Sequence, residues 1–581
     1  MKKLTAVFLA VVMLMALTLT ACQNPSSDAG NETPVVIGDD GKDAGDEDDV
    51  KQVKTITAKE LMKNVNARKA IALAFDKTYI ADVILNNGST AADYFVPKSL
   101  ATDEDGVDFR AKYPDGFLKH DPDLAAAYWQ TAKDELGFDQ VEIEFLTYDT
   151  EMSKKISEFI QGQLNENLEG LSVVLNQQPF KNKLELSDAG EFEFEYAGWG
   201  PDYPDPMTFL DLFLTGSGHN TAGYSSQVFD DYVLSSKVGD LAGKPAERWE
   251  TLQEAERILV EEDAVVVPIF QRGTSSLQAP HVTGVISHAF GGDFSYKYAQ
   301  TTLESDGKKI IRLLDTSDIP TMDTNKATDA VSFEVMANVL EGLVMLGEND
   351  VPELGVATSY EISEDGLVYT FKLREDSLWS NGDKVTANDF VYSWRRLADP
   401  ATASQYQSMI ETAQLKNYAA VMKGELPVTE LGVVALDDYT LQATLEIPVP
   451  FFIKLMTFPN FYPVSEAFVT EVGDAFGTSV ETTLYNGPFQ LNDWEIGYGY
   501  GFVKNDSYHS AQDVNIDGVT YRIIKDTAAG VNLYDTGEVD RAGLSGEFVE
   551  QYIDHPHFVV DSDVSLFYLI FNINNDGMDE E

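Results

Sequence analysis

The sequence predicts an α/β fold that is divided into two to four lobes. Amphipathic helical segments alternate with short β-prone runs along most of the chain, which is typical of α/β architectures. At 581 residues the chain is too long for one simple core, because a domain commonly holds about 150 residues. Hydrophobic residues make up 44% of the sequence and aromatic residues 11%, so most of the chain can bury a sizeable core.

The first third of the chain is predicted to form an α/β lobe with mainly covered strands. Apolar residues recur at helical spacing at 66–77, 123–136 and 246–262. Strands are predicted for the β-prone runs at 141–147, 192–196 and 265–270.

The later part of the chain contains more strand. A strand from Lys308, a turn at Pro320 and a helix at 331–340 come first. Residues 358–373 then predict an antiparallel sheet with one exposed face, because 368–373 alternate cleanly between apolar and polar side chains. Further strands are predicted at 432–436, 441–445, 519–524 and 565–571. The glycine-rich run at 497–501 is interpreted as a hairpin turn.

The charge and the cysteine content exclude several classes of protein. Lys and Arg number 41 against 96 Asp and Glu, which gives a net charge of −55 and repels nucleic acids. The single cysteine, Cys22, excludes an intrachain disulfide and any cysteine-rich metal site.

The chain begins with a targeting segment. Lys2 and Lys3 precede an apolar run that ends at Leu19-Thr20-Ala21-Cys22, a tetrapeptide that resembles the lipobox of bacterial lipoproteins. The resemblance implies that residues 1–21 are a signal peptide and that Cys22 becomes the lipidated amino terminus. A plain signal peptide or a membrane anchor with an incidental cysteine is the alternative.

Residues 22–63 are predicted to form an acidic tether, because they contain too little apolar surface to offset the entropy of ordering. The run at 46–49 could instead bind calcium, although it lacks the glycine and the closing glutamate of an EF-hand loop. Residues 576–581 are predicted to be a disordered tail.

Motifs that would indicate an enzyme are missing from the sequence. It contains no HExxH, no Walker A and no GxSxG pattern. The pair His555 and His557 is interpreted as a surface turn, and acid pairs such as Asp202 and Asp205 arise by chance among so many carboxylates. We therefore expect neither an enzyme nor a cofactor or metal.

Several segments carry a family resemblance. The run GLVYTFKLREDSLWSNGDKVTANDFVYSWRRLADP at 366–400 resembles the signature of bacterial extracellular solute-binding proteins of family 5, and is most similar to the oligopeptide-binding lipoproteins of ABC importers. Four other stretches agree with the same family, at 66–77, 198–211 (GWGPDYPDPMTFLD), 316–323 (TSDIPTMD) and 485–489 (YNGPF). The resemblance that these stretches mark extends over nearly all of the chain after residue 60.

The order of these segments differs from the family pattern. The family's second half, about 64–300, comes first here, and its first half, about 309–575, comes second. The resemblance therefore implies a circular permutant in which 301–308 joins the family's natural ends. A fusion of halves from two related genes is the alternative.

The resemblance implies a two-lobed clamp of the periplasmic-binding-protein type, which has an extra small subdomain. Residues 64–276 would form one lobe, here called the N-terminal lobe. Residues 277–351 and 450–575 would form a hinge lobe, and 352–449 a small subdomain inserted in it. Two crossover strands connect the lobes in this family, and the permutation would open one of them.

The resemblance also implies the ligand-binding residues. Asp202 falls where the family places the acid that pairs with the ammonium group of a bound peptide, which makes a charge-assisted hydrogen bond. Gly198 and Gly200 would leave room for the peptide main chain, and Trp199 would form an apolar wall. Without the resemblance, Asp202 would be an ordinary turn residue and the other three would be turn or core residues.

Other candidate residues come from the opposite half of the chain. Tyr485, Asn486 and Gly487 resemble a segment whose main chain pairs with the ligand, although Asn-Gly is also a common hairpin turn. Asp318 and Tyr406 match cleft positions more weakly. Enteric members carry an arginine where this sequence has Tyr196, so a cation for the ligand carboxylate would have to come from elsewhere.

The predicted function is that of a monomeric lipoprotein on the extracytoplasmic face of the cell membrane, which captures oligopeptides and delivers them to an ABC permease. A family receptor for another ligand, such as a nickel complex, haem or an oligosaccharide, is an alternative. A secreted hydrolase and a surface lipoprotein without a ligand are further alternatives. No nucleic-acid partner is expected.

Overall fold

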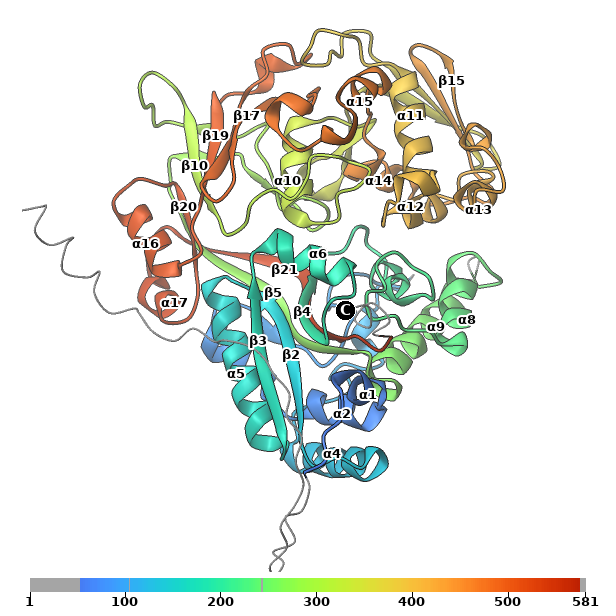
Figure 1. The fold of residues 1–581 in the computed structure, drawn as a ribbon. Helices are drawn as coiled ribbons and strands as arrows, with labels where there is room; N and C mark the ends of the chain where they lie inside the picture. The colour runs from blue at the N-terminus through green and yellow to red at the C-terminus, as the bar shows by residue number, and fades with distance from the viewer. Residues whose placement is uncertain (1–52, 104, 242–243, 575–581) are drawn as a thin grey trace, which may run out of the picture. The chain divides into compact units, whose positions relative to one another are not determined.

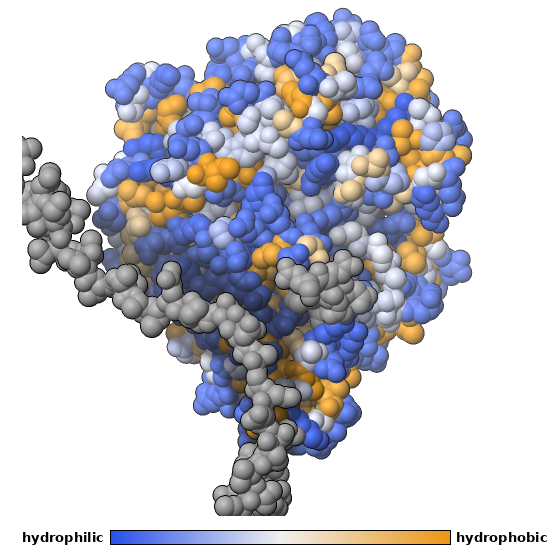
Figure 2. All heavy atoms as spheres, viewed as in Figure 1, coloured by the Kyte–Doolittle hydropathy of each residue, from blue (hydrophilic) through white to orange (hydrophobic). Residues whose placement is uncertain are grey.

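The computed structural model describes residues 53–103, 105–241 and 244–574 (Figure 1). The predicted signal peptide, the lipidation site Cys22, the acidic run at 46–49 and the predicted tail lie outside the described residues. Figure 2 shows that hydrophilic residues cover most of the face in view, with smaller hydrophobic areas between them.

The packed body begins earlier than predicted, which corrects the tether boundary at residue 63. Helix α1 (Ala58–Lys63) starts with a capping box, in which Thr57 and Glu60 satisfy each other's main-chain N–H groups. Leu61 and Met62 of this helix are fully buried. The main chain of Lys54 is already attached to the body, because its N–H group donates to Asp139 at 3.0 Å.

The N-terminal lobe is built on a mixed sheet with the strand order β1-β5-β21-β4-β2-β3, and β20 also pairs with β5. The strands are β1 (Thr90–Ala91), β2 (Val141–Tyr148), β3 (Leu171–Gln178), β4 (Phe194–Trp199), β5 (Val266–Gln278), β20 (Arg541–Leu544) and β21 (Phe558–Phe571). Strands β2, β3 and β4 pair in parallel, whereas β21 is antiparallel to both β4 and β5.

Helices connect and cover these strands, as predicted for an α/β lobe. They are α2 (Val65–Leu73), α3 (Lys77–Tyr79), α4 (Pro122–Leu136), α5 (Glu151–Asn167), α6 (Phe180–Asp188), α7 (Met207–Leu210), α8 (Gln227–Lys237) and α9 (Pro245–Arg257). The helices predicted at 123–136 and 246–262 are confirmed, whereas the one predicted at 66–77 ends at Leu73 and a separate short helix begins at Lys77. Helix α9 continues through a π-helical turn at Ile258–Glu262.

The hinge lobe contains a second sheet, with the order β10-β19-β18-β17. Its strands are β10 (Ile310–Asp315), β17 (Phe489–Glu495), β18 (Gly499–Lys504) and β19 (Gly518–Ile523), and helix α10 (Ala330–Val339) belongs to the same region. The hairpin turn predicted at 497–501 lies at its beginning, where Gly497 has a φ of 80° between β17 and β18, whereas 499–501 already belong to β18.

The small subdomain contains an antiparallel sheet with the order β13-β14-β16-β15. The strands are β13 (Ala357–Ile362), β14 (Val368–Leu373), β15 (Val433–Asp437) and β16 (Thr440–Thr444), with helix α11 (Ala387–Ala398). Tyr369, Phe371 and Leu373 are buried on alternate positions of β14, while β13 is exposed after Ala357. The predicted one-sided sheet is therefore confirmed.

The remaining elements are short. The helices are α12 (Gln407–Thr412), α13 (Tyr418–Met422), α14 (Phe452–Leu455), α15 (Glu466–Val472), α16 (Thr527–Asp535) and α17 (Glu547–Tyr552). The strands are β6 (Val282–Thr283), β7 (Ile286–Ser287), β8 (Phe294–Ser295), β9 (Gln300–Thr301), β11 (Val344–Leu346) and β12 (Pro352–Leu354).

Two long strands connect the lobes. Figure 1 shows β5 and β21 side by side, and they pair from Phe558 with Leu277 to Ile570 with Val266. At one end these strands pair with β1 and β4 of the N-terminal lobe, and at the other they pair with each other beside β20. Strands β20 and β21 thus belong to this sheet, although they come from the residues predicted for the hinge lobe. Relative motion of the lobes therefore has to bend or twist these two strands.

Candidate functional site

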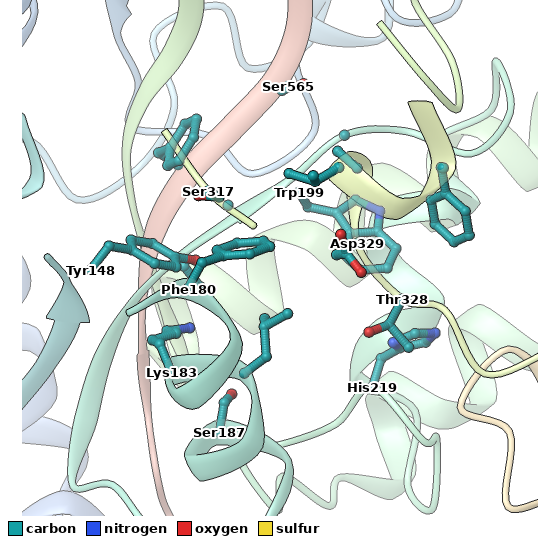
Figure 3. Close-up of a pocket in the computed structure, with 18 of the residues that line it drawn as sticks. Tyr148, Phe180, Lys183, Ser187, Trp199, His219, Ser317, Thr328, Asp329 and Ser565 are labelled. Atoms are coloured by element: carbon teal, nitrogen blue, oxygen red, sulfur yellow. The ribbon is translucent and has the colours of Figure 1, made fainter. Parts of the chain in front are cut away.

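A cavity of about 470 Å³ lies between the lobes (Figure 3). The N-terminal lobe contributes Asp202 and its neighbours, the hinge lobe contributes Asp329 and Phe333, and the small subdomain contributes Gln405 and Tyr406. The crossover strand β21 adds Ser565 to the wall. A volume of this size falls in the range of small-molecule binding sites.

The end of strand β4 places the first group of predicted residues in the cavity wall. Gly198 and Trp199 are the last residues of β4, and Gly200 follows it. A β-carbon on Gly198 would lie only 2.7 Å from the ring of Phe567 on β21, so no other residue fits this position without displacing that ring. The absence of a side chain at Gly198 thus serves packing against β21.

Asp202 is the buried acid of the cavity. The hydroxyl of Tyr406 donates to its carboxylate at 3.0 Å, and its own main-chain N–H donates to the Thr208 hydroxyl at 3.0 Å. Burial raises the pKa of the Asp202 carboxyl well above its usual range, and the hydrogen bond from Tyr406 opposes this only in part. Among the described residues no cation lowers it. The carboxylate is therefore ready to pair with a positive charge.

An aromatic cluster surrounds this acid. The ring of Tyr406 lies 4.6 Å from that of His219 and 6.3 Å from that of Trp199, measured between centroids. Phe333 and Phe458 contact Tyr406 from the hinge lobe at 5.6 and 5.5 Å. Apolar faces of this kind accept side chains of many shapes.

A second contact between the lobes lies behind the cavity wall. The ammonium group of Lys237 is 3.0 Å from Asp211 in its own lobe and 3.0 Å from Glu411 in the small subdomain. Burial by itself would lower the pKa of Lys237, but the two carboxylates outweigh it and raise the pKa. Together with the bond between Tyr406 and Asp202, this ion pair holds the lobes in a closed arrangement.

The cations that line the cavity are already paired. Lys183 on α6 lies 2.7 Å from Glu195, and both side chains are almost completely buried. Arg272 on β5 pairs with Asp293 at 3.0 Å and also with Asp563. Figure 3 shows Lys183 on the side of the pocket opposite Trp199 and His219.

The sequence model for "Bacterial extracellular solute-binding proteins, family 5 Middle" matches residues 38–221 and 351–580 of this chain. The chain belongs to this family. Periplasmic oligopeptide-binding protein OppA of Salmonella typhimurium is 38% identical over 224 residues, which are 39% of this chain and 41% of that protein. Dipeptide-binding protein DppE of Bacillus subtilis is 30% identical over 294 residues, 50% of this chain and 52% of that protein.

Solved structures of similar proteins include the substrate-binding domain of an oligopeptide ABC transporter from Bacillus anthracis. It is 46% identical, with a TM-score of 0.42, and the match covers 44% of this chain and 49% of that one. Listeria monocytogenes OppA bound to peptide is 40% identical, with a TM-score of 0.42 and coverage of 43% and 49%. The chain thus spans about half the length of the relatives that it matches.

The remaining residues predicted to bind the ligand of this family 5 protein lie outside the cavity wall: Tyr485, Asn486, Gly487 and Asp318. The N–H of Tyr485 donates to the Ser380 hydroxyl and that of Gly487 to the Val339 carbonyl, while the Asn486 side chain bonds to the main chain of Glu341. The bond from Tyr485 links the hinge lobe to the small subdomain, whereas the bonds of Asn486 and Gly487 lie within the hinge lobe. A ligand role for these three residues stays a prediction.

Asp318 also has a partner within the fold. Its carboxylate accepts the N–H group of Gly497 at 2.7 Å in the turn between β17 and β18. Tyr196, which stands where enteric members have an arginine, packs against Tyr148 and Phe567 in the core of the N-terminal lobe. A role for Asp318 in ligand binding likewise stays a prediction.

Sequence reasoning missed three side chains of this solute-binding protein. His219 and Lys183 line the cavity, and Lys237 makes an ion pair between the lobes. His219 falls eight residues after the last residue of the family-like segment at 198–211, and this proximity was the one available signal.

No cluster of three or more metal-ligating side chains occurs in the described residues. None of the helices that they form combines the length and apolarity needed to cross a bilayer.

Proposed function

We propose that this protein captures oligopeptides in the cavity between its lobes and presents them to an ABC permease. The observation that carries the proposal is Asp202, a buried carboxylate in the cavity wall that has no cationic partner among the described residues. A buried charge of this kind is costly unless it is paired. The ammonium group of a peptide would supply the missing charge.

Lobe closure would enclose the bound peptide. Asp202 belongs to the N-terminal lobe and Tyr406 to the small subdomain, so their hydrogen bond forms only when the lobes meet. The surrounding aromatic rings present apolar faces, which tolerate different peptide side chains. Selection for the amino terminus, and not for side chains, would follow from this arrangement.

Calorimetry with trialanine and with N-acetyl-trialanine tests the proposal. We expect the wild-type protein to bind free trialanine and to lose affinity for the acetylated form. Asp202→Asn should cost about 2–5 kcal/mol of affinity for the free peptide, as expected for truncating one member of a buried charged pair. Asp437→Asn, at an exposed position at the end of strand β15, is the control. Equal binding of both peptides to the wild type would refute the proposal.

We further propose that the protein is anchored to the outer face of the cell membrane through lipid on Cys22. Two acyl chains hold a protein on a bilayer stably, whereas one chain binds only marginally. Cys22→Ser should release the protein from the membrane fraction while the melting temperature of the folded body stays unchanged. Retention of this variant in membranes washed with high salt would contradict the anchor.

The circular permutation is also our proposal. The family model matches two separate stretches of the chain, and the relatives align over about half of each chain. An alignment that keeps residues in order can match only one half of a permuted chain, so partial coverage of this kind is expected for a permutant. The region of the proposed joint is a tight turn, in which Asp306 and Gly307 both have positive φ and Ser305 pairs with Lys308. Such a turn can connect two strand ends without crossing the cavity.

The two opened ends lie near each other in the fold. Arg68 on α2 donates to the carbonyls of Asp263 and Ala264, and the N–H of Phe571 donates to the carbonyl of Val265. A variant that joins β21 directly to α1 and is opened at 301–308 should therefore fold and bind trialanine as the wild type does. Failure of this variant to fold would favour a fusion of two genes.

A further inference from the structure

Two nitrogen atoms in the cavity wall have no hydrogen-bond partner among the described residues. They are Nε1 of Trp199 and Nε2 of His219, and both atoms are shielded from solvent. Buried polar atoms are nearly always satisfied, and leaving one unpaired costs free energy. Both residues line the cavity, and Figure 3 shows them on the same side of it.

The two nitrogens lie beside the acid that is proposed to hold the ligand ammonium. The rings of Trp199 and His219 are 5.1 Å apart, and the ring of Tyr406 lies 4.6 Å from His219. Tyr406 in turn donates to Asp202. The rings that carry the two nitrogens therefore belong to the aromatic cluster that surrounds Asp202.

His219 is neutral at physiological pH. Burial and the positive charge of Lys237 lower its pKa to about 4. A neutral imidazole donates one hydrogen bond and accepts one, and an indole nitrogen only donates. A positively charged ligand group is thus attracted by Asp202 and not repelled by His219. In the tautomer that carries its proton on Nε2, His219 donates from that atom, and both unpaired nitrogens then suit a neutral oxygen acceptor.

We infer that Trp199 Nε1 and His219 Nε2 form a hydrogen-bonding site for main-chain carbonyl oxygen next to the amino terminus of the ligand. The inference rests on the proposed function and adds to it. Asp202 fixes the ammonium group, and the two nitrogens require a peptide-type carbonyl at the adjacent position. A simple amine would satisfy Asp202 but would leave both nitrogens unpaired, so the site prefers peptides over amines.

The test uses two ligands that differ at one group. Trialanine is compared by calorimetry with its analogue in which an E-alkene replaces the first amide. The analogue keeps the ammonium and the shape but lacks both the carbonyl and the amide N–H, so the ring variants described next are needed to assign the effect to the carbonyl. The wild type should bind the analogue about three- to ten-fold more weakly for each hydrogen bond that is lost. Trp199→Phe and His219→Phe keep an aromatic ring without the nitrogen, so each should reduce this discrimination.

Two further measurements separate the possible outcomes. If His219→Phe does not fold, His219→Gln replaces it in the test. The glutamine side chain supplies a hydrogen-bond donor, so this variant should keep part of the wild type's discrimination between the two ligands. The indole N–H resonance of Trp199, assigned among the six tryptophans with Trp199→Phe, should move downfield with trialanine and not with the alkene. An equal loss of affinity for both ligands in His219→Phe would show a packing role only and overturn the inference.

The inference and the proposed function fail in different ways. If the wild type does not distinguish trialanine from N-acetyl-trialanine, the role of Asp202 is wrong. If that distinction holds while the alkene binds as tightly as trialanine, the carbonyl site alone is wrong.

Discussion

The hydroxyl of Tyr406 donates a hydrogen bond of 3.0 Å to the carboxylate of Asp202, and the two residues come from different lobes. This bond lowers the pKa of Asp202, against the larger effect of burial, which raises it. The contact therefore links lobe closure to the protonation state of the acid that is proposed to bind the ligand.

Peptide affinity should fall as the pH is lowered through the raised pKa of Asp202. Below that pKa the free protein carries a proton on Asp202, and pairing with an ammonium group has to release it. Calorimetry in two buffers with different heats of ionisation should detect this release, and Asp202→Asn should abolish it. In Tyr406→Phe the pH midpoint should move upward, because the hydrogen bond that lowers the pKa is lost. A midpoint that moves downward would contradict this account.

The ion pair between Lys237 and Glu411 should favour the closed arrangement. Glu411→Gln removes the charge on the small subdomain while Lys237 keeps Asp211, so we expect opening and a loss of about 1 kcal/mol of apparent peptide affinity. Small-angle scattering of the unliganded protein should show a larger radius of gyration. Lys119→Gln, which breaks an exposed pair with Asp115 inside the N-terminal lobe, is the control and should change neither quantity.

Lys183 and Glu195 should be strongly coupled in stability. Both are almost completely buried, so Lys183→Met leaves an uncompensated carboxylate and should cost about 3–5 kcal/mol of unfolding free energy. The double variant Lys183→Met/Glu195→Gln should recover most of that loss in urea denaturation. Additive losses in the double variant would show that the pair is not coupled.

Asp329 should make the protein less stable as the pH rises from about 4. Burial raises its pKa to about 6, so the folded state binds a proton that the unfolded state has lost, and the stabilisation disappears as the pH passes 6. Asp329→Asn keeps the cap of helix α10 and removes the titration. The variant should be more stable than the wild type by about 1–3 kcal/mol at pH 8. Thermal melts between pH 4 and 8, with Asp437→Asn as control, measure the effect.

Features carried by neighbouring residues could be predicted from the sequence. The helix at 123–136 was found at Pro122–Leu136, and the alternating strand at 368–373 was found with the same bounds. The turn at Gly497 was likewise predicted correctly. Helical and strand periodicity depend on positions a few residues apart, so they are visible in one sequence. The placement of Asp202 and Tyr406 required the family resemblance.

Contacts between distant residues were decided only by the tertiary structure. Tyr406 and Asp202 are 204 positions apart, and the partners of Lys237 and the unpaired nitrogens of Trp199 and His219 also depend on how the lobes close. Helix α1 was assigned to the tether for the same reason, because a helix of six residues is unstable until Leu61 and Met62 can pack against the lobe. Local sequence determines which residues can form an element, whereas burial and pairing are set by what the folded chain brings next to them.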